Sequence, residues 1–216
     1  MKHFTLFFLF FFCFFAQSVE AQRFGAGIIT GLNMAQLTGD LNVGFNKPGL
    51  TAGVRGTVRL SQNIDLCLEL LYSRRGSRPR LWARGDSLEF DISMDYVSIP
   101  VMIHILDWKA NKVESDRFYH VRFEGGLAYS RLFRTQILDR GNKYIIPYAQ
   151  NIDKFNTDDF SWVVGLSGFV TRHWAFELRF TQSINNILSD KNSSIATPFQ
   201  PYLRGYFVSL QAVYML

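Results

Sequence analysis

The sequence predicts an all-β fold, an eight-stranded antiparallel up-and-down transmembrane β-barrel. Apolar and polar residues alternate over segments of about ten residues, which is the period of a strand and enough length to cross a bilayer at a tilt. The connections run long, short, long, medium, long, short and long, so one end of the barrel (the loop end) carries the long ones and the other (the turn end) mostly short ones. Aromatic residues make up 16% of the chain and gather near predicted strand ends, as in interfacial belts.

The start of the chain has the features of a secretory signal peptide. Lys2 precedes an apolar run from Phe4 to Phe15, and Val19 and Ala21 stand before the predicted cleavage point. The run is shorter than the roughly 20 residues that a transmembrane helix needs. We therefore assign residues 1–21 to a cleaved signal peptide and residues 22–216 to one barrel domain, exported to the bacterial outer membrane.

Charge and cysteine content limit the classes of partner and fold. The chain has a formal net charge of +5 and a pI of about 9.3, but export makes nucleic acid an unsuitable partner for a basic chain. Cys13 lies in the predicted signal peptide and leaves with it, so Cys67 remains alone. Because a single cysteine cannot form an internal disulfide, the fold is predicted to rely on hydrogen bonding and packing.

The clearest hairpin joins the alternating segments Leu50–Leu60 and Ile64–Tyr72 through a short turn centred on Gln62. Each segment puts aliphatic residues on one face and charged or small residues on much of the other. This turn brings opposite charges directly across from one another, on the face away from the aliphatic residues. The facing pairs are Arg55 with Glu69 and Arg59 with Asp65.

Six further segments complete the predicted barrel, and each alternates apolar residues with polar or small ones. One of them contains Pro100, which lacks a backbone donor, so we expect a local β-bulge there. The six segments are Phe24–Met34, Tyr96–Ile105, Tyr119–Tyr129, Phe160–Val170, Trp174–Phe180 and Tyr206–Leu216.

A soluble eight-stranded cup of the lipocalin type is the alternative fold, and it reverses the two faces. In that fold the charged face meets water and the aliphatic face surrounds a ligand. In the membrane barrel the aliphatic face meets lipid, and closure pairs the backbone groups without leaving an edge, as hydrocarbon requires. The loop lengths and the aromatic belts favour the membrane barrel.

Short motifs occur along nearly the whole predicted mature chain. They are Gly31-Leu-Asn33, Gly39-Asp40, Lys47-x-Gly49, Gly53, Glu69-Leu-Leu-Tyr72-Ser-Arg-Arg-Gly76, Tyr96-Val-Ser-Ile-Pro100 and Gly125-Gly126. These motifs resemble the PorT-like outer-membrane β-barrel family of Bacteroidota, although Tyr214-Met-Leu216 replaces the usual final aromatic residue. The resemblance implies an outer-membrane barrel, in a family whose roles are mostly undefined and whose name comes from members tied to protein secretion.

The charged faces predict a lumen filled by ion pairs. Four basic and four acidic side chains fall on inward faces, and a barrel of eight strands is narrow enough to be filled by its side chains. Buried charges are tolerated only when paired, so the balance favours a plugged lumen over the alternative of a small-solute channel. The predicted lumenal ion pairs involve Arg55, Arg59, Asp65, Glu69, Arg122, Glu124, Glu177 and Arg179.

The sequence offers little material for catalysis, which needs a nucleophile, a base and an orienting acid close together. His104 and His120 flank one predicted hairpin near the turn end, where Ser98 or Glu124 could join them. A lipid-modifying barrel hydrolase is therefore an alternative function, although lone histidines more often pack or cap. The spacings of metal ligands are absent from the sequence, and we predict no catalytic, cofactor-binding or metal-binding residues.

A basic stretch after Tyr72 is predicted to be a long loop. Its arginines, with Trp82 among them, suit contact with the phosphates of outer-leaflet lipid through bidentate hydrogen bonds. The alternative is a solvated loop whose charge is partly balanced by nearby acidic residues. The candidate lipid-phosphate contacts are Arg74, Arg75, Arg78, Arg80 and Arg84, and the balancing residues are Asp86, Glu89 and Asp91.

The expected function is a non-enzymatic structural or interaction role. The absence of a catalytic constellation in the sequence and the balanced charges of the lumen favour this role over a hydrolase or a channel. The expected partners are outer-membrane lipid and envelope proteins, in a larger envelope or secretion assembly, with the long loops presented to the exterior.

Overall fold

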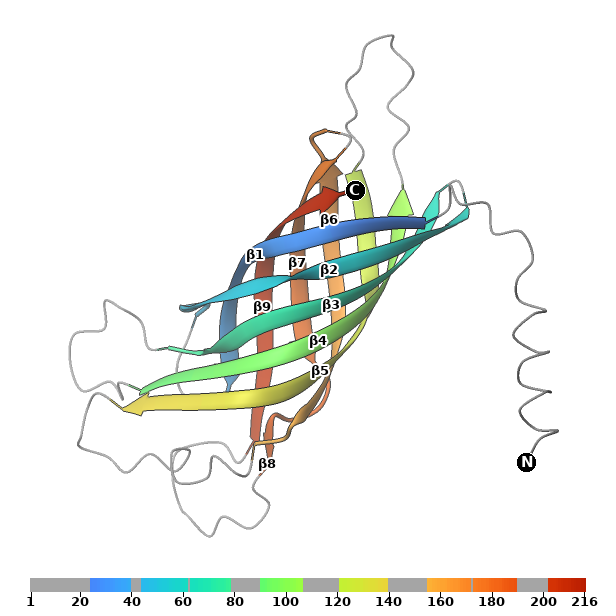
Figure 1. Cartoon of the computed structure of the whole chain (residues 1–216). Coiled ribbons are helices and arrows are strands. Elements are labelled where there is room, and N and C mark those ends of the chain that lie inside the picture. Colours follow the sequence, from blue (N-terminus) through green and yellow to red (C-terminus); the bar gives the residue numbers. More distant parts are fainter. Residues whose placement is uncertain are drawn as a thin grey trace, which may run out of the picture.

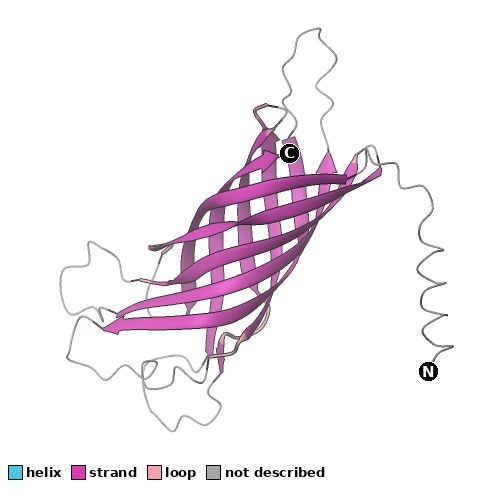
Figure 2. Cartoon of the chain, viewed as in Figure 1, coloured by secondary structure: helices cyan, strands magenta, loops and turns pink. Residues whose placement is uncertain are grey.

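The computed structural model describes residues 24–39, 44–61, 63–78, 90–106, 121–139, 155–171, 173–189 and 202–216. These residues form an antiparallel sheet that closes on itself as a barrel (Figure 1). Strands and short connections account for the whole described part, which contains no helix (Figure 2). The strands are β1 Phe24–Thr38, β2 Lys47–Ser61, β3 Ile64–Ser77, β4 Phe90–Leu106, β5 Val121–Asp139, β6 Asp158–Phe169, β7 Trp174–Ser183, β8 Leu188–Ser189 and β9 Tyr202–Met215.

The barrel wall consists of eight strands, β1 to β7 and β9, each antiparallel to its neighbours. The pairing of β1 with β9, from Gly27 opposite Met215 to Thr38 opposite Arg204, closes the wall. The predicted eight-stranded up-and-down barrel is confirmed. The two-residue strand β8, which pairs with β9 at the loop end, was not predicted. A search of the described residues finds no helix with the length and apolar character to cross a membrane.

Aliphatic side chains face outward, and charged side chains face inward, on the same strands. Leu68 and Leu127 have 56% and 62% of their surface exposed, whereas the neighbouring Glu69 has 1%. The lipocalin-like cup is therefore wrong for this chain, because it requires the charged face to meet water. The outward aliphatic surface is the one that hydrocarbon would cover.

The register of the β2–β3 hairpin is the predicted one. Arg55 pairs with Glu69 and Arg59 with Asp65, and the ladder shifts only at the turn, between Arg59 and Ser61. A slip of one residue would move the whole set of charged side chains on a strand to the outward face. The hairpin register therefore fixes which side chains fill the lumen.

Pro100 does not produce the bulge that we predicted for it. The β3–β4 ladder keeps one register on both sides of Pro100 and lacks pairs at Ile99 and Pro100 themselves. The missing backbone donor therefore opens the ladder locally without adding a residue. The register shift of β4 lies against β5, between Asp95 and Tyr96.

Strands β3, β4 and β5 continue past their predicted boundaries at the loop end. β3 extends to Ser77, β4 begins already at Phe90, and β5 continues to Asp139. Polar and turn-forming residues suggested loops in these stretches, but sheet pairing continues through them. Figure 1 shows β4 and β5 extending toward the lower left, away from the short turns.

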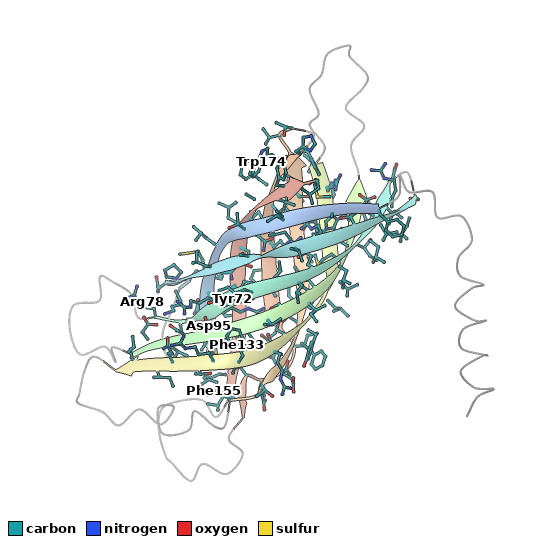
Figure 3. All side chains as sticks on the ribbon, viewed as in Figure 1. Tyr72, Arg78, Asp95, Phe133, Phe155 and Trp174 are labelled. Atoms are coloured by element: carbon teal, nitrogen blue, oxygen red, sulfur yellow. The ribbon has the colours of Figure 1, made fainter. Side chains whose placement is uncertain are left out.

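Aromatic side chains line both ends of the barrel wall. Figure 3 shows Trp174 at one end and Tyr72 with Phe133 toward the other. The ring centroids are 6.2 Å apart for Tyr72 and Phe133, 5.3 Å for Tyr129 and Phe160, and 5.1 Å for Trp174 and Tyr214. Trp108, Phe118 and Tyr119, aromatic residues between β4 and β5 in the sequence, lie outside the described residues.

Two glycines of the sequence motifs stand where neighbouring strands approach closely. A Cβ atom at Gly53 would lie 2.0 Å from the carbonyl oxygen of Leu70, and one at Gly126 would lie 2.1 Å from that of Val101. No side chain can be accommodated at such distances without moving the backbone. Strand packing therefore explains these two motif positions.

Candidate functional site

Two arginines and three glutamates meet at the centre of the lumen. Arg55 donates from Nε to Glu69 Oε1 at 2.8 Å, and its two terminal nitrogens lie 2.5 and 2.6 Å from the oxygens of Glu177. β2 is thereby joined both to its neighbour β3 and to β7, which is not its neighbour in the wall. The planar fork of a guanidinium allows this double contact, which a lysine ammonium could not reproduce.

Arg179 of β7 makes the corresponding contacts from the opposite wall. Its Nη1 and Nη2 lie 2.8 and 2.9 Å from the oxygens of Glu69, and its Nε donates to Glu124 Oε2 at 2.7 Å. Nη2 also lies 2.9 Å from Glu177 Oε2. We call Arg55, Glu69, Glu124, Glu177 and Arg179 the central network; all five side chains are buried, and each has an ionic partner, as burial requires.

The other three predicted lumenal charges lie nearer the turn end and make longer contacts. Asp65 is buried, with Arg59 Nε 3.5 Å and Arg122 Nη1 3.6 Å from its carboxylate oxygens. The guanidinium carbon of Arg122 lies 4.2 Å from the ring centroid of Phe169. The Arg59 side chain is 58% exposed, because the residue stands near the end of β2, where the lumen opens.

Arg75 faces the lumen, so its predicted contact with lipid phosphate is wrong. Its Nη1 donates to Asp159 at 2.9 Å, and its Nη2 donates to Ser98 and Ser130 at 2.9 and 3.0 Å. The physical reason is that β3 continues to Ser77, so the alternation of the strand places Arg75 on the same face as the central network. Asp159 of β6, for which no role was predicted, is its ionic partner.

Apolar side chains gather over the lumen at the loop end. The guanidinium carbon of Arg75 lies 4.8 Å from the ring centroid of Tyr96, at the edge of this group, and 4.3 Å from that of Phe207. We call this group the mouth cluster. The sequence pattern did not predict it, because several of its members are isolated apolar residues within polar segments. Figure 3 labels one of them, Phe155. The members are Leu37, Ile92, Met94, Tyr96, Leu132, Phe155, Ile187, Leu188 and Leu203.

Comparison with known proteins assigns the family. A family model described as "Outer membrane protein beta-barrel domain" matches residues 15–189 of the chain. The chain belongs to this outer-membrane β-barrel family. The protein is accordingly an outer-membrane barrel, and the lumen described above is the interior of its membrane-spanning wall. A search of curated proteins finds no match.

Several solved structures match most of the chain at low sequence identity. Ail of Yersinia pestis, solved with the heparin analogue sucrose octasulfate, has 9% identity and a TM-score of 0.44, covering 90% of this chain and 99% of its own. Neisserial surface protein A has 11% identity and a TM-score of 0.41, covering 88% and 96%. The N-terminal barrel domain of Pseudomonas aeruginosa OprF has 8% identity and a TM-score of 0.33, covering 89% and 99%.

A cavity of about 30 Å³ lies within this outer-membrane barrel, bordered by Arg75 on the loop side and Arg179 of the central network. Its other lining residues include Asn33, Thr181 and Gln211. Such a volume holds on the order of one or two water molecules, since one water needs roughly 10–15 Å³ of this kind of space. The cavity is therefore far smaller than a site for an organic ligand.

Cys67, His104 and Glu124 form a row that resembles a nucleophile, a base and an acid. Cys67 Sγ lies 3.4 Å from His104 Nδ1, and His104 Nε2 lies 3.9 Å from Glu124 Oε2. The thiol and the imidazole are fully buried, and neither borders the cavity described above. Ser98 hydrogen-bonds Arg75 instead, and His120 lies outside the described residues. Nor do the described residues contain three or more His, Cys, Asp or Glu side chains placed to hold a metal ion.

The remaining arginines of the predicted basic loop have acidic partners or are not described. Arg74 lies on β3 and donates to both carboxylate oxygens of Asp95, at 2.7 and 3.2 Å. Arg78 Nε lies 3.3 Å from Asp91, one of the acidic residues that were predicted to balance the charge of these arginines. Arg80 and Arg84, with Asp86 and Glu89, lie outside the described residues.

Proposed function

We propose that this outer-membrane barrel is closed to solutes and has a non-enzymatic structural or interaction role. The observation that carries the proposal is the central network, in which Arg179 of β7 hydrogen-bonds Glu69 of β3 through the lumen. Charged hydrogen bonds of this kind are strong, and a hydrated path along the axis would have to break them. A barrel without a hydrated path for solutes is left with its outer surface and its two ends as the parts that can contact other molecules.

Two further layers support a closed lumen. Toward the loop end, Arg75 is held by Asp159 and two serines, and beyond it the mouth cluster packs apolar side chains. The cavity between the Arg75 layer and the central network is of water size, about 30 Å³. An ion that entered from the loop end would meet first an apolar layer and then fixed charges of both signs, which oppose conduction.

The interaction role is supported by the shape of the loop end. β4 and β5 are the longest strands, with 17 and 19 residues, and they continue past the aromatic belt. A paired hairpin of this length presents side chains in fixed positions, which favours recognition by a partner. The resemblance of the sequence motifs to the PorT-like family of Bacteroidota supports a role in a larger envelope or secretion assembly. In this proposal the chain is exported and residues 1–21 are removed as a signal peptide.

Conductance in planar bilayers tests the closed lumen. The folded mature protein should give no stable stepwise current. The double variant Arg179→Ala with Glu69→Ala removes the link between β3 and β7, leaves only that of Arg55 with Glu177 in the central network across the lumen, and should raise the frequency of transient currents. Folding of each sample is checked by its altered migration on unheated gels. Stable steps from the unsubstituted protein would contradict the proposal.

Capture of partners tests the interaction role. The barrel is purified from outer membrane solubilised in mild detergent, and co-purifying proteins are identified by mass spectrometry. A variant in which the β4–β5 hairpin carries Phe133→Ser and Leu138→Ser, at outward positions, is the matched control. An envelope protein that is recovered with the unsubstituted barrel and lost with this variant supports the role. Recovery of the barrel alone at low detergent counts against it.

A further inference from the structure

The outward surface of β3 to β6 carries the same short unit twice at the loop end. Tyr72-Ser-Arg74 lies on β3, and Tyr129-Ser-Arg131 lies on β5. In the first unit the tyrosine hydroxyl and Arg74 Nε donate to Asp95 Oδ1, at 2.8 and 2.7 Å. In the second the hydroxyl and Arg131 Nη1 donate to Asp158 Oδ1, both at 2.7 Å. Each aspartate belongs to the next strand of the wall.

Both units stand where the apolar outward surface ends. The preceding outward residues, Leu70 and Leu127, have 51% and 62% of their surface exposed. The tyrosines that follow belong to the aromatic belt, which in outer-membrane barrels lies at the level of the lipid headgroups. Arg74 and Arg131, two positions further along their strands, are thereby placed at headgroup level. Figure 3 shows Tyr72, Asp95 and Phe133 close together in this region.

A third arginine lies in the same row, and the arginines outnumber the aspartates. Arg134 is exposed and stands opposite Asp95 in the β4–β5 ladder. A guanidinium has five N–H donors, and the contacts above engage two nitrogens of Arg74 and one of Arg131. The aspartates hold two of the three guanidiniums in place, which lowers the entropy that a further ligand would have to overcome.

We propose that Arg74, Arg131 and Arg134 bind the phosphate of a phosphorylated lipid in the outer leaflet. Arginine pairs with phosphate through parallel N–H donors, and the remaining donors of the row suit this contact. A lipid matches the surface better than a soluble anion, because the outward leucines on the membrane side of the two tyrosines provide an apolar wall for its acyl chains. The site goes beyond the closed-lumen role and is independent of whether the lumen conducts.

Arg59 provides a matched contrast within the same chain. Its side chain is 58% exposed, as is that of Arg131, and it too has an aspartate partner, Asp65 at 3.5 Å. It lies at the turn end, however, and on the lumenal face of its strand. An effect on lipid binding that is specific to the proposed site should therefore appear on substitution of Arg131 and be absent on substitution of Arg59.

Lipid binding is measured by native mass spectrometry on the folded mature barrel in detergent micelles. The probes are diphosphoryl lipid A, the same lipid with both phosphates removed, and inorganic phosphate. The unsubstituted barrel should bind the phosphorylated lipid in preference to the other two probes. Arg131→Ala with Arg134→Ala should weaken that binding about tenfold, as expected for the loss of charge-assisted hydrogen bonds. Arg59→Ala should leave the binding unchanged.

Four results would overturn the proposal. The first three are equal binding of the dephosphorylated lipid, an equal loss caused by Arg59→Ala, and binding of inorganic phosphate as tight as that of the lipid. All the substituted arginines are exposed, so the variants should still fold, and altered migration on unheated gels verifies this before binding is measured. A lipid preference that survives in the folded double variant would also place the phosphate contact elsewhere.

Discussion

Arg179 Nη1 lies 2.8 Å from Glu69 Oε2, which joins β7 to β3 through the centre of the lumen. The central network to which both residues belong contains two guanidiniums and three carboxylates. The arginines are therefore the scarcer group. Removal of one arginine leaves three carboxylates with a single cation, whereas removal of one glutamate leaves two charges of each sign.

Arg179→Met should be the most damaging single change in the central network. It should lower the free energy of unfolding by about 3–5 kcal/mol, because three buried carboxylates then share one guanidinium. Glu124→Gln should cost clearly less, since Glu124 receives one hydrogen bond from Arg179 and its Oε1 has no partner among the described residues. Urea unfolding of the barrel in lipid vesicles measures both. Equal losses of unfolding free energy in the two variants would mean that the excess of carboxylates over guanidiniums does not determine the stability of the network.

Removing a glutamate together with the arginine should recover stability, because the network then has its original excess of one carboxylate. Arg179→Met combined with Glu69→Leu leaves one cation and two carboxylates, with apolar side chains in the vacated space. The double variant should therefore be more stable than Arg179→Met alone, by the same urea measurement. A double variant whose loss equals the sum of the two single losses would mean that Arg179 and Glu69 are not coupled.

Leu68→Arg should block insertion of the barrel into lipid vesicles. Leu68 is outward and 56% exposed near the middle of the apolar part of β3, where arginine facing lipid costs about 2–4 kcal/mol. Leu60 is also 56% exposed, but it lies next to the end of β2, where the cost falls to about 0–1 kcal/mol. Leu60→Arg is thus the matched control, and the folded fraction on unheated gels is the measurement. Equal insertion of the two variants would mean that their depths are the same.

Arg75→Met and Arg74→Met should differ although the two residues are adjacent. The first leaves Asp159 buried without its cation and should cost about 3–5 kcal/mol of unfolding free energy. The second removes a pair in which the Arg74 side chain is 38% exposed, and it should cost about 0–1 kcal/mol, since the buried Asp95 keeps the hydroxyl of Tyr72. Urea unfolding in vesicles separates the two. A larger loss for Arg74→Met would mean that Arg74, and not Arg75, faces the lumen in the loop-end half of β3.

The thiol of Cys67 should react with a maleimide only after unfolding. The residue is fully buried against His104, and a bulky reagent has no access to it. Ser61→Cys in a Cys67→Ser background places a thiol at an exposed position near the turn and should react in the folded barrel. Labelling followed by mass spectrometry gives the extent for each. Rapid labelling of Cys67 in the folded protein would indicate a lumen open to solutes.

The predictable part of the lumen is the part set by local hairpin geometry. The facing of Arg55 and Glu69 follows from a short turn and a period of two, both of which are visible in the sequence. The contacts of Arg179 with Glu69 and of Arg55 with Glu177 depend on the diameter of the closed barrel. The alternation of apolar and polar residues does not depend on that diameter. It therefore predicts that these charges face the lumen, but not which charges contact one another across it.

The loop end was harder to predict because its composition conflicts with its structure. Arg75 lies in a stretch of arginines with Gly76, and such a composition suggests a solvated loop. The alternation Ser73, Arg75, Ser77 was nevertheless a usable signal for a continuing strand. Phe155 and Leu203 stand near polar segments, so their packing in the mouth cluster depends on tertiary contacts that the sequence pattern does not reveal.

The long sequence separations in the central network bear on the order in which the barrel assembles. Arg55 and Glu177 are 122 residues apart, and their strands face one another only when the sheet has curled round. A curved sheet of β1 to β4 alone would carry Arg55 and Glu69 into hydrocarbon without their partners on β7, at a cost that rises with depth. Strand-by-strand entry is therefore disfavoured, and the charges couple membrane crossing to closure of the β1–β9 seam.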